Sequence, residues 1–555
     1  MTAPAAEVDV VIIGGGATGA GVLRDLAMRG LRTLLVERGD FASGTSGRYH
    51  GLLHSGARYV ESDPVSARHC AEENEVLRRI APATIEPTEG YFVATPDDPD
   101  DYLDRFPAAC SAAGVEAEPV PLADLFAAEP LLNRQIRAAY RVRDASLEPW
   151  ELVDANLASA REHGAQAWRY HEVIGFDRDA DGGITAVRVR DVRTGEEKAV
   201  ACRAAVSASG AWAGKVAALA GARLTMSPGK GSMLILNRRM TKAVVNRLAP
   251  PGDGDIIVPV HTVCILGTTD VTVPDPDNVH VTDEEITALL ADGDRLVPGL
   301  SGARVLRTYA GSRPLYDASE LDRGQHHEES REISRAHHVI DHGSRDGVGR
   351  FWSIVGGKLT TYRLMARDTA DAVAAALGVD APCRTGDEPL PKPADGAWYW
   401  LGDRLAAVET EGGGDADLIC ECEIVTRARL EHALDERGDS SLDDLRRTTR
   451  LGMGPCQGAF CMPRAAALLD ERAAEGGLAP EAPPANEALR AFMAERFKGT
   501  RPIAWGEQLL ELWLTAGIYR GVLAVDELPG ATPAPAPAPV AVPVAREGDH
   551  TDAAG

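Results

Sequence analysis

The sequence predicts an α/β protein in which a nucleotide-binding domain is interleaved with a second domain and followed by a small α-rich module. A glycine-rich turn, Gly14 to Gly19, comes directly after a mostly apolar run at 8–13. Strand-like and helix-like segments then alternate up to about residue 380, and no loose linker divides them. Four of the nine cysteines lie close together much later in the chain, at Cys420, Cys422, Cys456 and Cys461. This second feature indicates a separate unit.

The first elements form a βαβ unit of about thirty residues. Residues 8–13, VDVVII, predict a buried parallel strand, 20–29 a helix with one apolar side, and 31–36 a second strand. Further strands are expected at 204–208, 232–236, 255–260, 263–267 and 351–355. Further helices are expected at 65–80, 150–162, 283–290, 362–377, 487–497 and 507–519.

Length, charge and hydropathy limit the classes of protein. A chain of 555 residues predicts about three or four domains. The net charge of −25 argues against a nucleic-acid binder, which would carry a basic face. The N-terminus lacks the features of a signal peptide, and no stretch reaches the ~18 uninterrupted apolar residues that a membrane-spanning helix needs. We therefore expect a cytoplasmic protein, or one held at a membrane surface by a partner.

The glycine-rich turn has the spacing of a dinucleotide-binding fingerprint. Gly14 permits the tight turn, Gly16 lets a pyrophosphate approach the backbone, and Gly19 lets the helix pack closely on the strand. The N-terminus of the helix offers N–H donors to phosphates. Glu37 ends the second strand and can accept a hydrogen bond from a ribose hydroxyl. The alternative is a glycine-rich turn in a domain that binds no nucleotide, and the fingerprint alone does not choose between NAD and FAD.

The segment 41–48 follows the second strand closely and is rich in glycine and hydroxyl side chains, among them Thr45 and Ser46. Such a loop can wrap a second phosphate and lie beside a flavin ring. It can also be a plain solvated loop.

Beyond these motifs the sequence resembles a known family. The segments GGGATGAGVLRDLAMRGLRTLLVER, TSGRYHGLLHSGARY, GSRPL and GGKLTTYR closely resemble the FAD-dependent glycerol-3-phosphate dehydrogenases. The resemblance runs from residue 8 to about 380, and the cysteine pattern and RPIAWG at 501–506 look like the extended, anaerobic-type A subunit. It implies a glutathione-reductase-like FAD-binding domain interleaved with an antiparallel-sheet substrate domain.

The resemblance also implies an activity. The family oxidises sn-glycerol 3-phosphate to dihydroxyacetone phosphate by hydride transfer to FAD, and electrons leave toward a quinone, often through partner subunits at the membrane. We expect a chain that binds glycerol 3-phosphate and such partners but no nucleic acid, and that lies in the cytoplasm, peripheral at the inner face of the cell membrane. Two alternatives stay open: an oxidase that uses O2, and a noncatalytic iron–sulfur scaffold or redox-sensing subunit.

A phosphorylated alcohol needs cations for its phosphate and a group that takes the hydroxyl proton. The resemblance implies that cationic side chains gather around the phosphate and the flavin. The expected phosphate-binding residues are Arg58, Arg313, Arg335 and Lys358, of which Arg58, Arg313 and Lys358 are also expected to be catalytic. For any one of them the alternative is a surface charge or a structural ion pair.

His54 is the candidate base, because a histidine with a pKa near neutrality suits proton abstraction. The alternative is a histidine that only hydrogen-bonds the flavin or the substrate. Related aerobic enzymes often carry a lysine just ahead of this histidine. This chain has Gly51 there, with Arg48 and His50 nearby, so its contacts on the flavin side are expected to differ.

The expected cofactor contacts come from several short segments. Ser209-Gly210 follows a predicted strand and resembles a second contact with the dinucleotide, although a plain strand-to-helix turn would look the same. The expected FAD-binding residues are Gly14, Gly15, Gly16, Thr18, Gly19, Glu37, Arg38, Thr45, Ser46, Val173, Gly210, Gly356, Gly357, Lys358 and Thr360.

The late cysteines form a C-x-C pair and a C-x4-C pair. Four thiolates can hold a soft metal centre. A disulfide is disfavoured in a reducing cytosol, and C-x-C is tight for structural zinc, so both stay minor alternatives. The spacing resembles the bacterioferritin-associated-ferredoxin type of module, which implies a [2Fe–2S] cluster held by Cys420, Cys422, Cys456 and Cys461. The cluster would either relay electrons from the flavin or have a structural role.

Composition suggests where the units begin and end. Residues 1–390 are expected to hold the interleaved oxidoreductase domains, 391–417 a linker with prolines and glycines, and 418–475 the [2Fe–2S] module. A helical region is expected over 485–528. Residues 529–555 form a proline- and alanine-rich tail that cannot build a core and is expected to be disordered.

Overall fold

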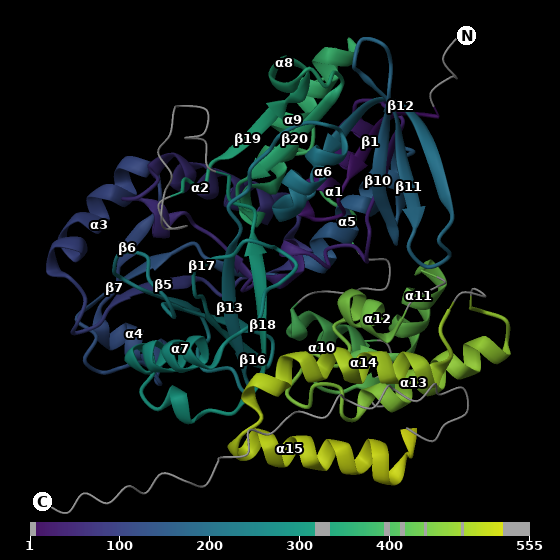
Figure 1. The fold of residues 1–555 in the computed structure, drawn as a ribbon. Coiled ribbons are helices and arrows are strands. Elements are labelled where there is room, and N and C mark those ends of the chain that lie inside the picture. Colours follow the sequence, from purple (N-terminus) through teal and green to yellow (C-terminus); the bar gives the residue numbers. More distant parts are fainter. Residues whose placement is uncertain are drawn as a thin grey trace, which may run out of the picture.

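The computed structural model describes residues 7–316, 333–392, 400–410, 417–437, 441–478 and 482–525. Figure 1 shows three parts: a parallel-sheet domain at the upper right, a second sheet domain at the left, and C-terminal helices below both. The tail expected at 529–555 lies outside the described residues.

The parallel sheet carries the glycine-rich turn at the carboxyl end of a central strand. Its order is β9-β2-β1-β12-β20-β19, and all neighbours are parallel except β19, which runs antiparallel to β20. The strands are β1 (Val8–Ile13), β2 (Thr33–Val36), β9 (Gln166–Trp168), β12 (Glu197–Ser207), β19 (His337–Asp341) and β20 (Phe351–Gly356). Every position of β1 is buried, as a strand covered on both faces requires.

Helices cover one face of this sheet, and a second layer covers the other. Over the first face α1 packs against α5 and α9 (Figure 1). On the other face β10 pairs antiparallel with β11, β11 pairs antiparallel with the start of β12, and α6 packs beside β10. These elements, with the short α8, are α1 (Ala17–Met28), α5 (Pro149–Glu162), α6 (Ala213–Leu219), α8 (His342–Asp346), α9 (Tyr362–Leu377), β10 (His171–Arg178) and β11 (Ile184–Asp191).

The second domain is built on a nine-stranded sheet in the order β17-β13-β16-β15-β14-β5-β7-β6, with β18 also paired to β13. Its pairs are antiparallel except β14 with β5. The strands are β5 (Gly90–Ala94), β6 (Ala117–Pro119), β7 (Ala138–Val142), β13 (Gly229–Leu236), β14 (Val244–Arg247), β15 (Ile256–Val260), β16 (Val263–Gly267), β17 (Val271–Thr272) and β18 (Val305–Arg313). The helices around it are α2 (Pro64–Ile80), α3 (Asp100–Ala113), α4 (Leu122–Ala128) and α7 (Asp283–Leu296).

A small sheet connects the cores of the two domains. It consists of β3 (Leu52–Leu53), β8 (Ala145–Leu147) and β4 (Ile85–Glu86), in that order. Consecutive strand residues point to opposite faces. Leu52 therefore packs in the core of the second domain, while Leu53 packs in the core of the parallel-sheet domain.

The C-terminal helices enclose a core of their own, which includes Leu434, Leu445, Leu469 and Phe492. The elements are α10 (Leu401–Thr410), β21 (Leu418–Cys420), β22 (Val425–Thr426), α11 (Arg427–Arg437), α12 (Leu442–Thr449), α13 (Cys461–Ala474), α14 (Ala485–Thr500) and α15 (Gly506–Ala516).

Part of the expected linker at 391–417 differs from the prediction. Residues 401–410 form α10, which is a helix and not a loose connection. Arg404 on this helix is buried and donates to Glu151 and to the backbone carbonyl of Glu423. These contacts involve residues distant in sequence, so the local composition gave no signal of them.

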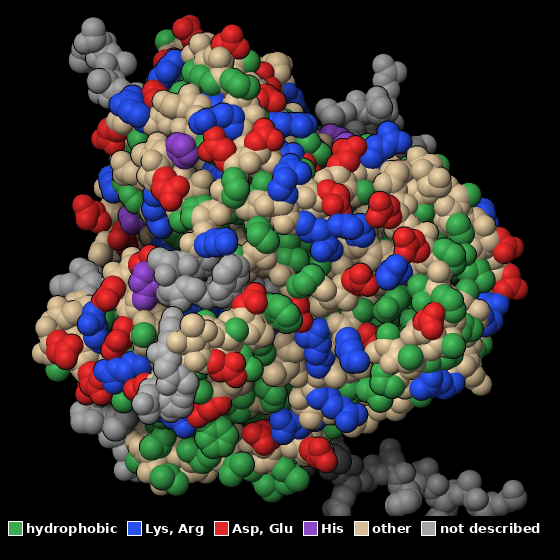
Figure 2. Space-filling model, turned by 180° about the vertical axis from the view of Figure 1, so that it is seen from behind, with side chains coloured by type: hydrophobic (Ala, Val, Ile, Leu, Met, Phe, Trp, Pro, Cys, Tyr) green, Lys and Arg blue, Asp and Glu red, His purple; other side chains and the backbone are tan. Residues whose placement is uncertain are grey.

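The outermost helix, α15, buries polar side chains and exposes apolar ones, which is the opposite of an ordinary surface helix. Its polar Gln508 and Thr515 are buried, whereas Leu510, Trp513 and Leu514 are 61%, 66% and 57% exposed. Figure 2 shows hydrophobic side chains gathered along the lower edge of the molecule, where α15 lies in Figure 1. Within the described residues, no helix combines the length and the apolar character needed to cross a bilayer.

Candidate functional site

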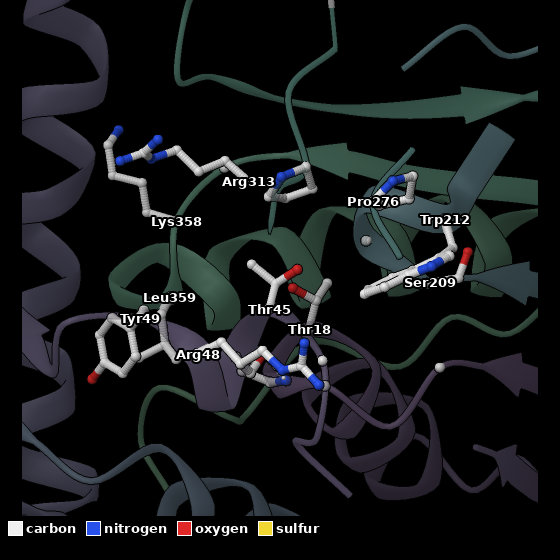
Figure 3. A pocket seen from close by; sticks show the side chains of 18 of the residues that line it. Thr18, Thr45, Arg48, Tyr49, Ser209, Trp212, Pro276, Arg313, Lys358 and Leu359 are labelled. Carbon is white, nitrogen blue, oxygen red and sulfur yellow. Dashed lines mark hydrogen bonds between the residues drawn. The ribbon is translucent and has the colours of Figure 1, made fainter. Parts of the chain in front are cut away.

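A cavity of about 590 Å³ lies where the parallel sheet meets the second domain. The carboxyl ends of β1, β2 and β20 supply one wall, and β18 supplies part of another. In Figure 3 Ser209 and Trp212 lie at one end of it, and the Arg313 and Lys358 side chains lie at the other, with Thr18 and Thr45 between them. A long ligand with chemically distinct ends suits such a cavity.

The glycine turn is tightly constrained by its surroundings. Gly14 has a φ of +109°, which favours glycine, and a Cβ there would lie 2.7 Å from the carbonyl oxygen of Ala208. A Cβ at Gly19 would lie 1.9 Å from the carbonyl oxygen of Gly14. A Cβ at Gly15 would meet Phe41 at 2.8 Å. Neither Gly15 nor Gly19 lines the cavity, so their role is to let the turn and α1 pack.

The N-terminus of α1 faces the cavity beside two hydroxyl side chains. The Ala17 N–H donates to Ser46 Oγ at 3.0 Å, and Ser46 lies against Gly16. Thr45 Oγ1 donates to the Ser312 carbonyl at 2.7 Å, which ties this loop to the second domain. A helix N-terminus with nearby hydroxyls fits the phosphates of a dinucleotide.

Glu37 and Arg38 lie on the nucleotide side of the cavity. Glu37 accepts hydrogen bonds from the N–H groups of Gly15, at 2.7 Å, and Gly39, at 2.9 Å. Burial raises the pKa of Glu37, and these two backbone bonds oppose that effect. Arg38 donates to Asp277 at 2.9 Å and lies over the ring of Trp212. Glu37 thus braces the glycine turn, and Arg38 closes the outer edge of the cavity.

The remaining expected cofactor residues also line the cavity, namely Thr18, Val173, Gly210, Gly356, Gly357, Lys358 and Thr360. Gly356 and Gly357 have φ values of +75° and +70°, and a Cβ at Gly357 would meet Met365 Sδ at 2.3 Å. Glycine is therefore required where this strand end approaches the cavity. Thr360 Oγ1 accepts a hydrogen bond from the His54 backbone N–H at 3.1 Å, which fixes the backbone at the candidate base.

Three of the four expected cations are already paired with carboxylates. Arg58 forms an ion pair with Asp255. Arg313 Nη1 donates to Asp270 at 2.8 Å, and Arg335 Nη2 lies 3.3 Å from the other oxygen of Asp270. Arg313 also donates to the Thr268 hydroxyl and to the carbonyls of Thr269 and Lys230. The arginines are therefore held in place by residues of the second domain.

Lys358 is different, because its ammonium is buried and has no hydrogen-bond partner among the described residues. Its Nζ lies 4.2 Å from the centre of the Tyr59 ring, which offers a cation–π contact. An unpaired buried cation is costly unless an anion joins it. This end of the cavity is therefore suited to an anionic ligand.

Two neutral histidines line the same end of the cavity, His50 and His54, with ring centres 5.6 Å apart. Burial lowers the pKa of His50 to about 3, and Arg313 and Arg58 add to the effect. Burial also lowers the pKa of His54 well below its usual value, reinforced by His50, Lys358 and Arg58. Both imidazoles are therefore uncharged near neutral pH. The pKa of His54 lies below the near-neutral value expected from the sequence, because the side chain is buried beside cations, so without an anion nearby it is a weak base.

The sequence motifs indicated the cations but not the carboxylates that pair with them, Asp255 and Asp270. His50 was noted only as a neighbour of His54. The HGLLH segment could have indicated His50, since both its histidines flank one short strand, β3. Asp255 and Asp270 lie in the second domain and carry no local signal of their pairing.

The four late cysteines come together around one loop. The Cys420 thiol interacts with the thiols of Cys422 and Cys461, and the Cys422 thiol also interacts with that of Cys456. Gly454 allows this approach, because a Cβ there would lie 2.3 Å from the Cβ of Cys422. Hydrogen bonds between thiols and burial raise the pKa of Cys456, and bound iron would reverse this by deprotonating the thiol.

The arrangement of these thiols fits a two-iron cluster. Across the described residues, no group of three or more His, Cys, Asp or Glu side chains converges as the ligands of a single ion do. The thiols instead form a row, Cys461–Cys420–Cys422–Cys456. A [2Fe–2S] cluster needs two thiolates at each iron, whereas structural zinc needs four at one point.

Comparison with known proteins agrees with this geometry. The family described as FAD dependent oxidoreductase matches residues 9–363, and the BFD-like [2Fe-2S] binding domain matches 418–471. The A subunit of the anaerobic glycerol-3-phosphate dehydrogenase from Escherichia coli (strain K12) is 42% identical over 94% of this chain and 97% of that protein. The A1 subunit of the corresponding enzyme from Haloferax volcanii is 41% identical over 95% of this chain and 92% of that protein.

The fold is shared with solved flavoproteins. The glycerol-3-phosphate dehydrogenase from Bacillus halodurans, solved in complex with FAD, superposes with a TM-score of 0.63 at 22% identity, covering 89% of this chain and 95% of that one. The chain is therefore a flavin-dependent oxidoreductase with an iron–sulfur domain.

Within that class, the chain belongs to the family of anaerobic glycerol-3-phosphate dehydrogenase A subunits. The resemblance and the fold class predicted from the sequence are confirmed, and so are FAD and a [2Fe–2S] cluster as its cofactors.

Proposed function

We propose that this chain oxidises sn-glycerol 3-phosphate to dihydroxyacetone phosphate and passes the electrons through its [2Fe–2S] cluster to a quinone-linked partner subunit. The observation that carries the proposal is Lys358, a buried cation without a hydrogen-bond partner in the described structure, at the end of the cavity away from Trp212 (Figure 3). The relatives that cover nearly the whole chain are named as glycerol-3-phosphate dehydrogenases.

The nucleotide end of the cavity would hold FAD. The glycine turn and the N-terminus of α1 would hold its pyrophosphate, and Thr45 and Ser46 would add hydroxyl contacts. Gly356 and Gly357 would let the end of β20 approach the ring. When bound, FAD supplies an acceptor for the two electrons and the hydrogen that leave carbon as a hydride.

The cationic end of the cavity would hold the substrate phosphate. The expected cations carry four positive charges there, and two carboxylates, Asp255 and Asp270, oppose them. Among these described side chains a formal charge of +2 remains, which complements a phosphate dianion. Lys358 would contribute the unpaired charge, while Arg313, held by Asp270, would contribute fixed donors.

His54 would take the proton of the secondary hydroxyl. As the C2 hydride leaves, the O–H bond breaks and its proton goes to the neutral imidazole, so that a C=O bond forms in the product. His54 is uncharged because it is buried beside cations, and a phosphate dianion nearby would raise its pKa toward the value of a useful base. His50 lies at the same end of the cavity, where its neutral ring would exclude water from the space beside His54 without adding a charge.

One experiment tests the substrate and its phosphate together. Under anaerobic conditions, glycerol 3-phosphate should bleach the visible flavin band, whereas glycerol should not. Lys358→Met should raise the concentration needed for half-maximal bleaching, and Lys358→Arg, which keeps the charge, should raise it less. Failure of glycerol 3-phosphate to bleach the flavin would overturn the proposal, and release of peroxide in air at the bleaching rate would indicate an oxidase.

A partner protein would accept the electrons beside α15. The apolar face of α15 exposes Trp513 and Leu514. Arg304 connects this helix to the cysteine loop, because it donates to Glu511 of α15 and to the Pro455 carbonyl. The relatives are named as A subunits, and aromatic anchors are typical of protein interfaces. A chain of net charge −25 suits an anionic lipid surface poorly.

Trp513→Glu with Leu514→Ser tests this surface. The paired substitution should release a co-expressed redox partner while flavin and cluster spectra stay unchanged. Loss of self-association, or loss of binding to lipid vesicles, would instead assign the surface to a second copy or to the membrane.

A further inference from the structure

Charged side chains are buried between the [2Fe–2S] module at 418–475 and the parallel-sheet domain. These two units are called the cluster module and the flavin domain below. Arg450 ends α12 and is 5% exposed. Its Nε donates to Glu423 of the cluster module at 3.0 Å, and its Nη1 donates to Glu148 at the start of α5 in the flavin domain. Both carboxylates are buried as well. One guanidinium therefore joins the two units through ion pairs that water does not reach.

Glu423 is adjacent to the cluster site, and Glu148 is connected to the flavin cavity through a hydrogen bond of the residue before it. Glu423 follows Cys422, an expected cluster ligand. Glu148 follows Leu147, whose carbonyl accepts a hydrogen bond from the Tyr49 hydroxyl at 2.8 Å. Tyr49 lines the flavin cavity (Figure 3). A short series of covalent and hydrogen bonds thus runs from the cluster loop to the cavity wall through Arg450.

Further polar contacts surround this connection. All three arginines come from the C-terminal helices and their acidic partners come from the flavin domain, whereas His261 belongs to the second domain. The contacts are Arg404 with Glu151 at 3.0 Å, Arg429 with Glu151 at 3.1 Å, Arg447 with Asp40 at 2.8 Å, Tyr170 with Asp444 at 2.6 Å and His261 with Glu423 at 2.6 Å. Complementary charges at several separate points permit one arrangement of the two units and penalise the others.

Such an interface is better suited to positioning than to stability. A buried ion pair loses about as much free energy through desolvation as it regains by attraction, but it tolerates only one geometry. An apolar interface of the same size could slide at little cost. The rate of electron transfer falls steeply with distance, so the relay needs a fixed separation of flavin and cluster.

We propose that Arg450 is a positioning residue, which locks the cluster module onto the flavin domain so that electrons cross between the two centres without movement of the module. The inference rests on the proposed function, because it assumes that the cluster receives electrons from the flavin. It assigns the role to a side chain that ligates neither centre and does not line the cavity.

Arg450→Lys and Glu148→Gln test the inference in the full chain. Arg450→Lys keeps the positive charge but removes the forked guanidinium, whereas Glu148→Gln keeps the size of the side chain and leaves the cluster module unchanged. Arg427→Lys is the matched control, because Arg427 pairs with Glu431 and Glu471 inside the cluster module only. The measurements are iron content, flavin bleaching by glycerol 3-phosphate, cluster reduction followed by electron paramagnetic resonance, and hydrogen exchange at 148–151 and 420–425.

Iron content, dithionite reduction of the cluster and the rate of flavin bleaching should match the wild type in all three variants. Cluster reduction by substrate should slow about tenfold or more in Arg450→Lys and Glu148→Gln, because small misplacements of reacting centres are costly. Hydrogen exchange at the interface should rise in these two variants and not in the control.

Three results would overturn the inference, the third of them independently of the proposed function. Unchanged cluster reduction in both interface variants would show that the position of the module does not depend on Arg450. Loss of iron in Arg450→Lys would show that the residue builds the cluster site itself. If the substrate bleaches the wild-type flavin but never reduces the cluster, the relay in the proposed function is wrong. In that case, unchanged hydrogen exchange at 148–151 and 420–425 in Arg450→Lys would still overturn the role of Arg450 in holding the two units together.

Discussion

At the scale of single residues, the cationic end of the cavity contains two kinds of cation: arginines paired with carboxylates, and a lysine without such a partner among the described residues. Arg58, Arg313 and Arg335 are held by Asp255 and Asp270, so their guanidinium groups are fixed before any ligand arrives. Lys358 has no such partner in the part of the chain that the structure describes. Fixed donors provide geometry, and the unpaired ammonium provides net attraction.

Arg313→Ala should raise the KM for glycerol 3-phosphate. A hydrogen bond to a charged group contributes about 1.5–3 kcal/mol, so an increase of about ten- to a hundredfold is expected. Steady-state kinetics measures it, with Arg188→Ala as a control, because Arg188 is a surface residue paired with Asp177. The loss of stability should be modest, since Arg313 lies at the end of β18 and Asp270 keeps Arg335 as a partner. An unchanged KM would remove Arg313 from the phosphate site.

His50 should make the protein less stable in acid. Its pKa is about 3 in the folded chain, below the usual histidine value, so the unfolded chain binds more protons as the pH falls below about 6.5. The contribution of neutral His50 to stability is therefore present above that pH and is lost progressively toward pH 3.

His50→Gln should flatten this dependence. Thermal unfolding midpoints measured from neutral pH down to about pH 5 should fall less steeply in the variant than in the wild type. His432→Gln is the control, because His432 lies on α11 with 39% of its side chain exposed. Parallel curves for His50→Gln and the wild type would contradict the buried neutral state of His50.

At the scale of elements, the regular periodic segments could be predicted from the sequence. The strands at 8–13 and 263–267 and the helix at 362–377 have the predicted bounds. The helix predicted at 283–290 extends to Leu296, because Gly293 packs closely against Leu266 and Leu300 and so does not end it. A local pattern cannot show a packing contact of this kind.

Elements whose contacts are distant were not predictable. The strand β18 carries Arg313, yet it is defined by pairing with β13, more than sixty residues earlier in the chain. The helix α10 was expected to be a linker, because the contacts of its buried Arg404 lie in other parts of the chain. The candidate site is predictable to the same extent. Local motifs indicated its cations, but the carboxylates Asp255 and Asp270 come close to them only in the folded chain.

Gly19→Ala should yield a protein that binds no flavin. Its Cβ would lie 1.9 Å from the Gly14 carbonyl, so α1 must move away from the turn and its N-terminal N–H groups lose their place. Gly302→Ala is the control, because that position has open space for a Cβ. The ratio of flavin to protein in the purified variants measures the effect. Full flavin content in Gly19→Ala would contradict the role assigned to the turn.

At the scale of the whole molecule, two redox units share one chain and a polar interface. The cavity proposed to hold FAD and the substrate lies between the two sheet domains, and the C-terminal helices place four cysteines on a separate core. The buried charges between these units favour one relative position. Because the cores are separate, we expect that the chain can lose one centre without losing the other.

Cys456→Ser should abolish the absorbance of the cluster and leave the flavin in place. Cys456 is one end of the row of thiols, and its loss leaves one iron with a single thiolate. Iron analysis and visible spectra measure the result, with Cys383→Ser as a control, since Cys383 lies outside the module. Stoichiometric iron in Cys456→Ser would show that the ligand assignment is wrong.

The central claim is that a flavin in the N-terminal cavity takes electrons from glycerol 3-phosphate and gives them to a cluster in the same chain. One anaerobic titration of the purified protein with glycerol 3-phosphate tests it most directly, followed by visible and electron paramagnetic resonance spectra. The account predicts that the flavin band bleaches and that the signal of a reduced [2Fe–2S] cluster then appears. A protein that stays colourless after reconstitution with FAD, or whose flavin does not respond to the substrate, would contradict it.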